Sequence, residues 1–110
     1  MIMTLQTAKQ VFDMIEDSGI SELKVDLYRA AEKYTSYRTA WRQTPPAHRH
    51  LIDSSRTQSH NALIDAFNIL SREQAKLGED NSWRGTLGAD RKAIGDMAAY
   101  IVLFLALSAR

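Results

Sequence analysis

Apolar residues recur at helical spacing in four long segments of the chain. Between residues 4 and 18 they lie on one face, with Thr4 placed to act as N-cap. Between residues 22 and 43 they form a seam with alternating steps of four and three, the pattern of helices that pack side by side. The seam consists of Leu23, Leu27, Ala30, Tyr34, Tyr37 and Trp41. We therefore predict helices over 4–18 and 22–43.

The third segment, residues 45–77, keeps one helical phase from Ile52 to Leu77. Thr44 and Pro45 suit the N-cap and the first position of a helix. The polar residues at 53–55 compete for backbone hydrogen bonds and would permit a bend. The preserved phase nevertheless favours one continuous helix over 45–77.

The fourth segment, residues 90–109, has Asp90 as its expected N-cap and contains the most apolar run of the chain. No residue of Met97–Leu107 is charged, and the apolar side chains surround the helix, so it must be covered on every side. Three neighbours in a small bundle cannot easily do this, which predicts a homo-oligomer. The expected interface buries part of four residues of the last helix: Tyr100, Leu103, Phe104 and Leu107.

The connection at 78–89 holds three of the five glycines and is predicted to be a loop, with Trp83 closing the core. Gly95, inside the last helix, is expected where a neighbouring helix approaches closely. Four helices with mostly short connections predict an all-α fold, an antiparallel up-and-down four-helix bundle that forms a single domain over residues 1–110.

Composition narrows the classes of protein. The chain has 14 Lys and Arg against 13 Asp and Glu, a net charge of +1, which predicts no strong attraction to DNA or to acidic membranes. It has no cysteine, so disulfides and thiolate metal sites are excluded and a cytoplasmic location is expected. The N-terminus lacks a signal-peptide pattern, and the apolar run is shorter than the roughly 20 residues that span a bilayer.

A polar stripe on the third helix is the main candidate for ligand binding. Asn61, Asp65, Asn68 and Arg72 follow steps of four and three, and they line either a pocket inside the bundle or a solvent-facing edge. Arg91 and Asp96 extend this set on the fourth helix. If the two helices are antiparallel neighbours, Arg72 lies beside Asp96, with Asn68 as a further hydrogen-bond partner.

Metal binding and nucleophilic catalysis find little support. His48 and His50 would project about 200° apart on a helix and cannot share a metal ion. His60 lacks a carboxylate three residues before it, as the Glu-x-x-His motif of di-iron bundles would require. The chain has neither a Gly-x-Ser-x-Gly motif nor a glycine-rich phosphate loop. We therefore predict no metal site and no catalytic residue.

Basic and aromatic residues alternate in the second and third helices, which is typical of nucleic-acid binding. The basic residues are Arg29, Lys33, Arg38, Arg42, Arg49 and Arg56, with Tyr34, Tyr37 and Trp41 between them. These aromatic residues also belong to the apolar seam of the second helix, so the core competes for them.

The stretch Ile94-Gly95-Asp96-Met97, followed by AAYIVLFLAL, resembles the last core helix of the MazG-like all-α nucleoside-triphosphate pyrophosphohydrolases. The resemblance implies a dimeric helical bundle in which carboxylates hold Mg²⁺ against a nucleotide. Asp96 matches the Asp of the family's Glu-x-x-Asp motif, but Ala93 stands at the Glu position, and the preceding helix has no Glu-x-x-Glu. A longer set of segments (SRTQSHNALIDAFNIL, Trp83-Arg84, Leu87-Gly88 and DRKAIGDMAAYI) resembles a small bacterial family of helical proteins with no assigned function.

Three hypotheses for function follow. The first is a non-enzymatic, self-associating interaction or accessory module. The second is a degenerate MazG-like pyrophosphohydrolase or nucleotide-binding protein, and only this hypothesis requires Mg²⁺. The third is a weak nucleic-acid binder.

Overall fold

The computed structural model describes residues 2–109, and every regular element within that range is a helix. In chain order the elements are α1 (Leu5–Glu16), α2 (Ser21–Gln43), the 3-10 helix η1 (Pro46–His48), α3 (His50–Lys76), α4 (Ser82–Leu87) and α5 (Arg91–Ser108). The all-α prediction is confirmed. None of the described helices is both long enough and apolar enough to cross a membrane.

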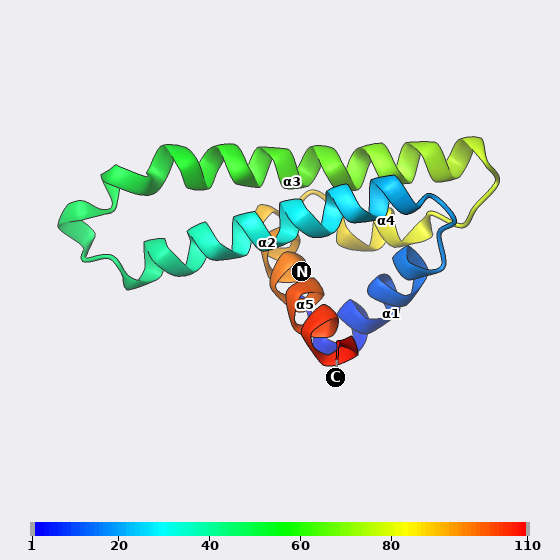
Figure 1. Ribbon diagram of the computed structural model, residues 1–110, viewed down its shortest axis with the longest axis horizontal. Helices are drawn as coiled ribbons and strands as arrows, with labels where there is room; N and C mark the ends of the chain where they lie inside the picture. Colours follow the sequence, from blue (N-terminus) through cyan, green and yellow to red (C-terminus); the bar gives the residue numbers. More distant parts are fainter. Residues whose placement is uncertain (1, 110) are drawn as a thin grey trace.

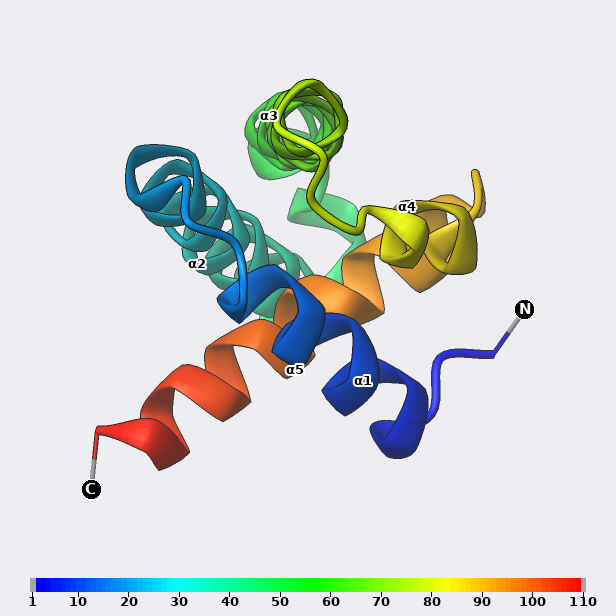
Figure 2. The same ribbon diagram turned by 90° about the vertical axis from the view of Figure 1, so that its right-hand side faces the viewer.

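The two longest helices, α2 and α3, form an antiparallel hairpin (Figure 1). The other helices lie on one side of this hairpin, and α5 crosses beneath it (Figure 2). The expected up-and-down order is therefore seen for α2 and α3, whereas α5 does not run alongside α3. Five α-helices are present in the described part of the chain, rather than the four predicted.

The additional helix, α4, occupies the segment that was predicted to be a loop. Trp83 and Leu87 lie one turn apart on it, and both are fully buried. The Trp83 indole N–H donates to Oε1 of Gln74 at 2.7 Å, and its ring packs against Phe67. Trp83 closes the core as expected. The sequence did not predict this helix, because the glycines at 85 and 88 lower the helix propensity of the segment. Burial of Trp83 and Leu87 stabilises α4 instead.

The predicted boundaries hold for most helices but not for the start of α3. The chain turns through the 3-10 helix at Pro46–His48, and α3 begins only at His50. Beyond that point α3 continues to Lys76 without a break at 53–55. Thr4 and Asp90 cap their helices as predicted, accepting hydrogen bonds from the backbone N–H groups of Thr7 and Lys92.

The hydrophobic core occupies only part of the hairpin. Apolar side chains of α1, α4 and α5 pack against α2 up to Tyr34 and against α3 from Leu63 onward, and none between residues 35 and 62 is buried. The end of the hairpin that carries η1 projects beyond the other helices (Figure 1). Polar contacts hold this end: the Trp41 indole N–H donates to Oδ1 of Asp53 at 2.7 Å, and Nε of Arg49 donates to the Trp41 carbonyl at 3.1 Å.

Where α5 crosses α2, the Tyr34 side chain packs against Gly95. A Cβ atom at this position would lie 3.0 Å from Oη of Tyr34, so the absence of a side chain permits the approach. One residue further along α5, Oδ1 of Asp96 accepts a hydrogen bond from Nη2 of Arg38 at 2.6 Å. The neighbour at Gly95 is thus the Tyr34 side chain of α2, which fills the space that the glycine leaves.

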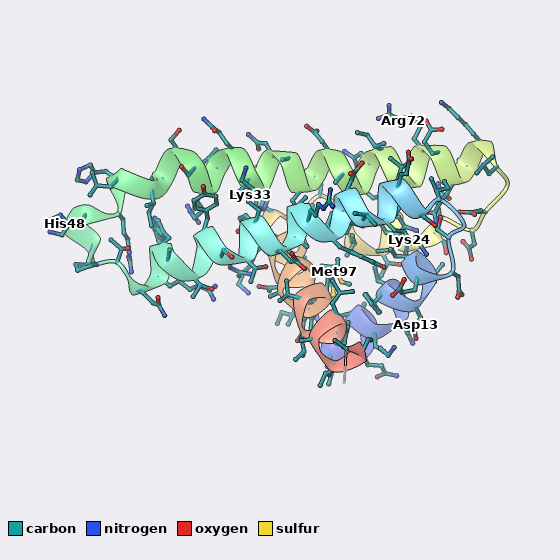
Figure 3. All side chains as sticks on the ribbon, in the orientation of Figure 1. Asp13, Lys24, Lys33, His48, Arg72 and Met97 are labelled. Atoms are coloured by element: carbon teal, nitrogen blue, oxygen red, sulfur yellow. The ribbon has the colours of Figure 1, made fainter. Side chains whose placement is uncertain are left out.

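The predicted pairing of Arg72 with Asp96 is wrong. Arg72 is exposed at the outer edge of α3 and points away from the other helices (Figure 3). The prediction assumed that α5 runs antiparallel to α3, but α5 packs chiefly against α2. Asp96 of α5 therefore pairs with Arg38 of α2.

Candidate functional site

The main candidate site is a cavity of about 390 Å³ where the projecting end of the hairpin begins. It is bounded by α2, α3 and the first turn of α5. Its lining residues are Tyr34, Arg38, Trp41, Arg42, Arg56, Thr57, His60, Arg91 and Lys92. Five of these are Arg or Lys and none is Asp or Glu, so we call this cavity the cation pocket.

The register of the hairpin brings the arginines of α2 and α3 together. Tyr34 meets His60 edge-on, with ring centroids 4.8 Å apart, and Trp41 meets Asp53 one hydrogen bond away. Tyr34 and Trp41 are seven positions apart on α2, and Asp53 and His60 are seven positions apart on α3. Between these two contacts, Arg38 therefore lies opposite Arg56. Arg38, one turn after Tyr34, and Arg56, one turn before His60, thus converge from two helices.

Asp96 neutralises part of this charge from the rim of the pocket. Its carboxylate accepts from Arg38 at 2.6 Å and from Nζ of Lys92 at 3.1 Å. Burial acts to raise the pKa of Asp96, but the hydrogen bonds from these two cations outweigh it and hold the pKa below the ordinary value. Asp96 is therefore ionised at neutral pH, and both of its carboxylate oxygens are bound by cations of the same chain.

His60 is 5% exposed and responds to the positive potential of the pocket. Its Nε2 lies 3.0 Å from the carbonyl oxygen of Arg91, which can only accept, so this nitrogen carries the proton. Nδ1 is buried and has no partner among the described residues. Burial lowers the pKa of His60, and the nearby Arg91, Arg56 and Arg38 lower it further, against the opposing effect of the Arg91 carbonyl. The imidazole is therefore neutral at pH 7.

The remaining cations are weakly compensated. The guanidinium carbon of Arg56 lies 4.4 Å from the centre of the Trp41 ring, and its buried Nε has no hydrogen-bond partner among the described residues. Arg91 donates to Oδ1 of Asn61 through a long bond of 3.3 Å. No ion pair or hydrogen bond of the Arg42 side chain is found in the described part of the chain. Arg91 and Lys92 also begin α5, where the helix dipole adds positive potential.

The structure distributes the predicted ligand-binding residues over several places. Arg91 lines the cation pocket, Asn61 contacts it, and Asp96 lies at the rim. Asn68 instead accepts a hydrogen bond from Nε of Arg84 at 2.7 Å, at the contact between α3 and α4. The other two residues of the stripe, Asp65 and Arg72, are exposed. The polar stripe of α3 is not brought together into one pocket.

Sequence reasoning considered Arg38, Arg42 and Arg56 only as part of a nucleic-acid surface. It did not join them to Arg91 and Lys92 of the last helix, and it missed the role of His60. A signal was nevertheless present. Arg38 and Arg42 follow Tyr34 at steps of four before the Pro45 turn, and Arg56 and His60 have the same step after it. In an antiparallel hairpin about this turn, the two arginines of the second helix lie across from Arg56 and His60 of the third.

The carboxylates that the MazG-like resemblance would require do not converge. Within residues 2–109 no three His, Asp or Glu side chains are grouped so that they could hold a metal ion. Asp96, the one residue that matches the family motif, faces Arg38 and Lys92 instead.

Comparisons with protein-family models, with curated proteins and with solved structures found no match to this chain. The geometry of the cation pocket is therefore the main basis for a functional proposal.

We predict that Asp96→Asn lowers the free energy of unfolding at pH 7 by about 1–3 kcal/mol, because Arg38 loses a charged partner in a largely buried place. The folded state lowers the pKa of Asp96 from 3.8. The difference between wild type and variant is therefore full above this value and disappears as the pH falls through the lowered pKa. Urea denaturation between pH 2 and 7 measures it.

The matched control is Asp13→Asn, which removes an exposed pair with Lys9 that has the same 2.6 Å length. It should change the stability by no more than about 0.5 kcal/mol. Equal effects of the two substitutions would contradict a special role for the Arg38–Asp96 pair.

Proposed function

We propose that this protein is a non-enzymatic binding module whose cation pocket holds a small ligand carrying phosphate groups. The observation that carries the proposal is the gathering of five cations around one cavity, without a lining carboxylate, in a chain whose net charge is only +1. Like charges this close repel one another in the free protein. A bound anion removes that repulsion, so the site favours occupation.

Phosphate suits the pocket better than a single carboxylate does. Arginine binds phosphate oxygens through paired N–H donors, and four of the five cations are arginines. The cavity of about 390 Å³ also falls in the range of small-molecule sites. A ligand with two linked phosphate groups would contact cations from α2, α3 and α5 together.

The nucleic-acid hypothesis receives less support from the same residues. The ring of Trp41 already contacts two guanidinium groups, those of Arg49 at 4.1 Å and Arg56 at 4.4 Å. Its indole N–H is bound to Asp53. These contacts use the aromatic surface on which a base would stack, so recognition by charge is favoured over recognition by stacking.

The pyrophosphohydrolase hypothesis shares a phosphate ligand with our proposal but requires Mg²⁺ held by several carboxylates. The carboxylate of Asp96 would have to leave Arg38 and Lys92 to bind a metal ion. The geometry therefore favours direct binding of phosphate by cations.

Titration calorimetry with inorganic pyrophosphate tests the proposal. We expect Arg42→Gln to weaken binding by about tenfold, because a charge-assisted hydrogen bond is lost. The control, Arg29→Gln, removes another exposed arginine of α2 that does not line the pocket and should leave the affinity unchanged. Affinity should also fall as salt is added.

An NMR titration of the His60 imidazole, with and without pyrophosphate, gives a second and independent test. A bound anion offsets the arginines that lower the pKa of His60, so pyrophosphate should raise this pKa. His48 and His50, at the far end of the hairpin, provide internal references. No binding heat, or equal losses in the two arginine variants, would contradict a localised site.

Self-association through α5 is a second candidate function. Leu103 and Leu107 are 44% and 49% exposed, which leaves an apolar edge that a second copy would cover. This edge is smaller than expected, because α1 already covers Phe104 through Phe12, with ring centroids 5.2 Å apart. Light scattering coupled to size exclusion should give a dimer mass at micromolar concentration, whereas a monomer mass would contradict this candidate.

A further inference from the structure

A second cavity adjoins the cation pocket. Its volume is also about 390 Å³, and it follows the edge between α2 and α5. Arg38 and Arg42 line both cavities, so the two share a wall. Beyond Asp96 the lining of the second cavity becomes apolar, and we call this part the apolar groove: Met3, Ala99, Tyr100 and Leu103.

The apolar groove is built into the structure rather than formed by loose surface residues. Met3 is 5% exposed and belongs to the core cluster, and the Tyr100 ring stacks on Phe104 with centroids 6.1 Å apart. Leu103 remains 44% exposed at the far side. One wall is thus fixed by the core, and the opposite side is open to a ligand.

The two cavities also follow one line along α5. Lys92 lies in the cation pocket, Asp96 at the shared wall, and Leu103 at the end of the apolar groove. Leu103 follows Lys92 by eleven positions along the helix, which is roughly 16 Å. Positive charge and apolar surface are therefore arranged in sequence along a single path.

We propose that the cation pocket and the apolar groove form one site for a single amphiphile with a phosphate head and an apolar chain. This inference rests on the proposed function, since the phosphate would occupy the cation pocket. Charge complementarity places the head at Arg42, whose side chain has no ion pair among the described residues, on the side of Arg38 away from its partner Asp96, and the groove then receives the chain that leaves it. A recess between two helices holds one chain, which favours a dissolved amphiphile over a bilayer surface.

Calorimetry with butyl, hexyl and octyl phosphate, below their micelle concentrations, tests the inference. A fully buried methylene group strengthens binding by roughly fourfold. Because the groove is open on one side, we expect a smaller gain, at least about tenfold in affinity from butyl to octyl phosphate. Pyrophosphate serves as a head without a chain, and octanol as a chain without a head.

Two variants locate the chain. Leu103→Gln should remove most of the dependence on chain length and leave pyrophosphate binding unchanged. Leu107→Gln, its control, alters another exposed leucine of α5 that does not line the groove. Thermal unfolding followed by circular dichroism verifies that both variants fold, and the chain-length series on the wild-type protein needs neither.

The outcomes separate the inference from the proposed function. Binding of pyrophosphate with no effect of chain length overturns the inference and leaves the proposed function intact. Failure of both ligands overturns both. Octyl phosphate binding that Arg42→Gln does not weaken would show that the head is not held by the cations, and also overturns the inference.

Two further results would assign the groove to another occupant. Vesicles of phosphatidylcholine with phosphatidic acid that bind the protein, when octyl phosphate does not, would indicate a membrane surface. A dimer by light scattering that excludes octyl phosphate would indicate a second copy. Either result contradicts the inference.

Discussion

The arrangement of this molecule depends on the close contact between α5 and α2 at Gly95 and Tyr34. A helix that is apolar on every side requires neighbours on every side. By crossing beneath the hairpin, α5 contacts all four other α-helices, most extensively α2. The glycine leaves room for the Tyr34 side chain of α2, and the neighbouring Arg38–Asp96 ion pair neutralises two side chains that the contact largely buries.

The same crossing accounts for the site. Because α5 begins beside the hairpin, its first residues, Arg91 and Lys92, meet arginines from α2 and α3. The core ends at this point, and the hairpin continues without buried apolar side chains. A chain selected only for stability would have little reason to gather cations there, since their repulsion opposes folding. Sites that bind ligands commonly violate local rules of stability in this way.

The sequence carried enough information for the helices, and less for their arrangement. Helical periodicity identified α1, α2, α3 and α5, and the isolated glycine at 95 correctly indicated tight packing at this position, although a side chain rather than a helix backbone provides it. It did not identify which helix approaches, because a pattern of residues specifies a buried face but not the crossing angle. The pairing predicted for Arg72 therefore failed, and Asp96 was assigned to the wrong partner. The cation pocket was missed because its residues come from three helices, and only the hairpin register brings them together.

The most direct test of the central contact compares Gly95→Ala with Gly85→Ala. A Cβ atom at 85 meets nothing within 4 Å, so alanine should stabilise the protein through helix propensity, by up to about 1 kcal/mol. At 95 the same gain is opposed by overlap with Tyr34, which is 5% exposed and held against His60. Overpacking costs about 1–3 kcal/mol, so Gly95→Ala should lower the free energy of unfolding in urea. If Gly95→Ala proves as stabilising as Gly85→Ala, α5 does not cross α2 at this residue, and the account of both fold and site is contradicted.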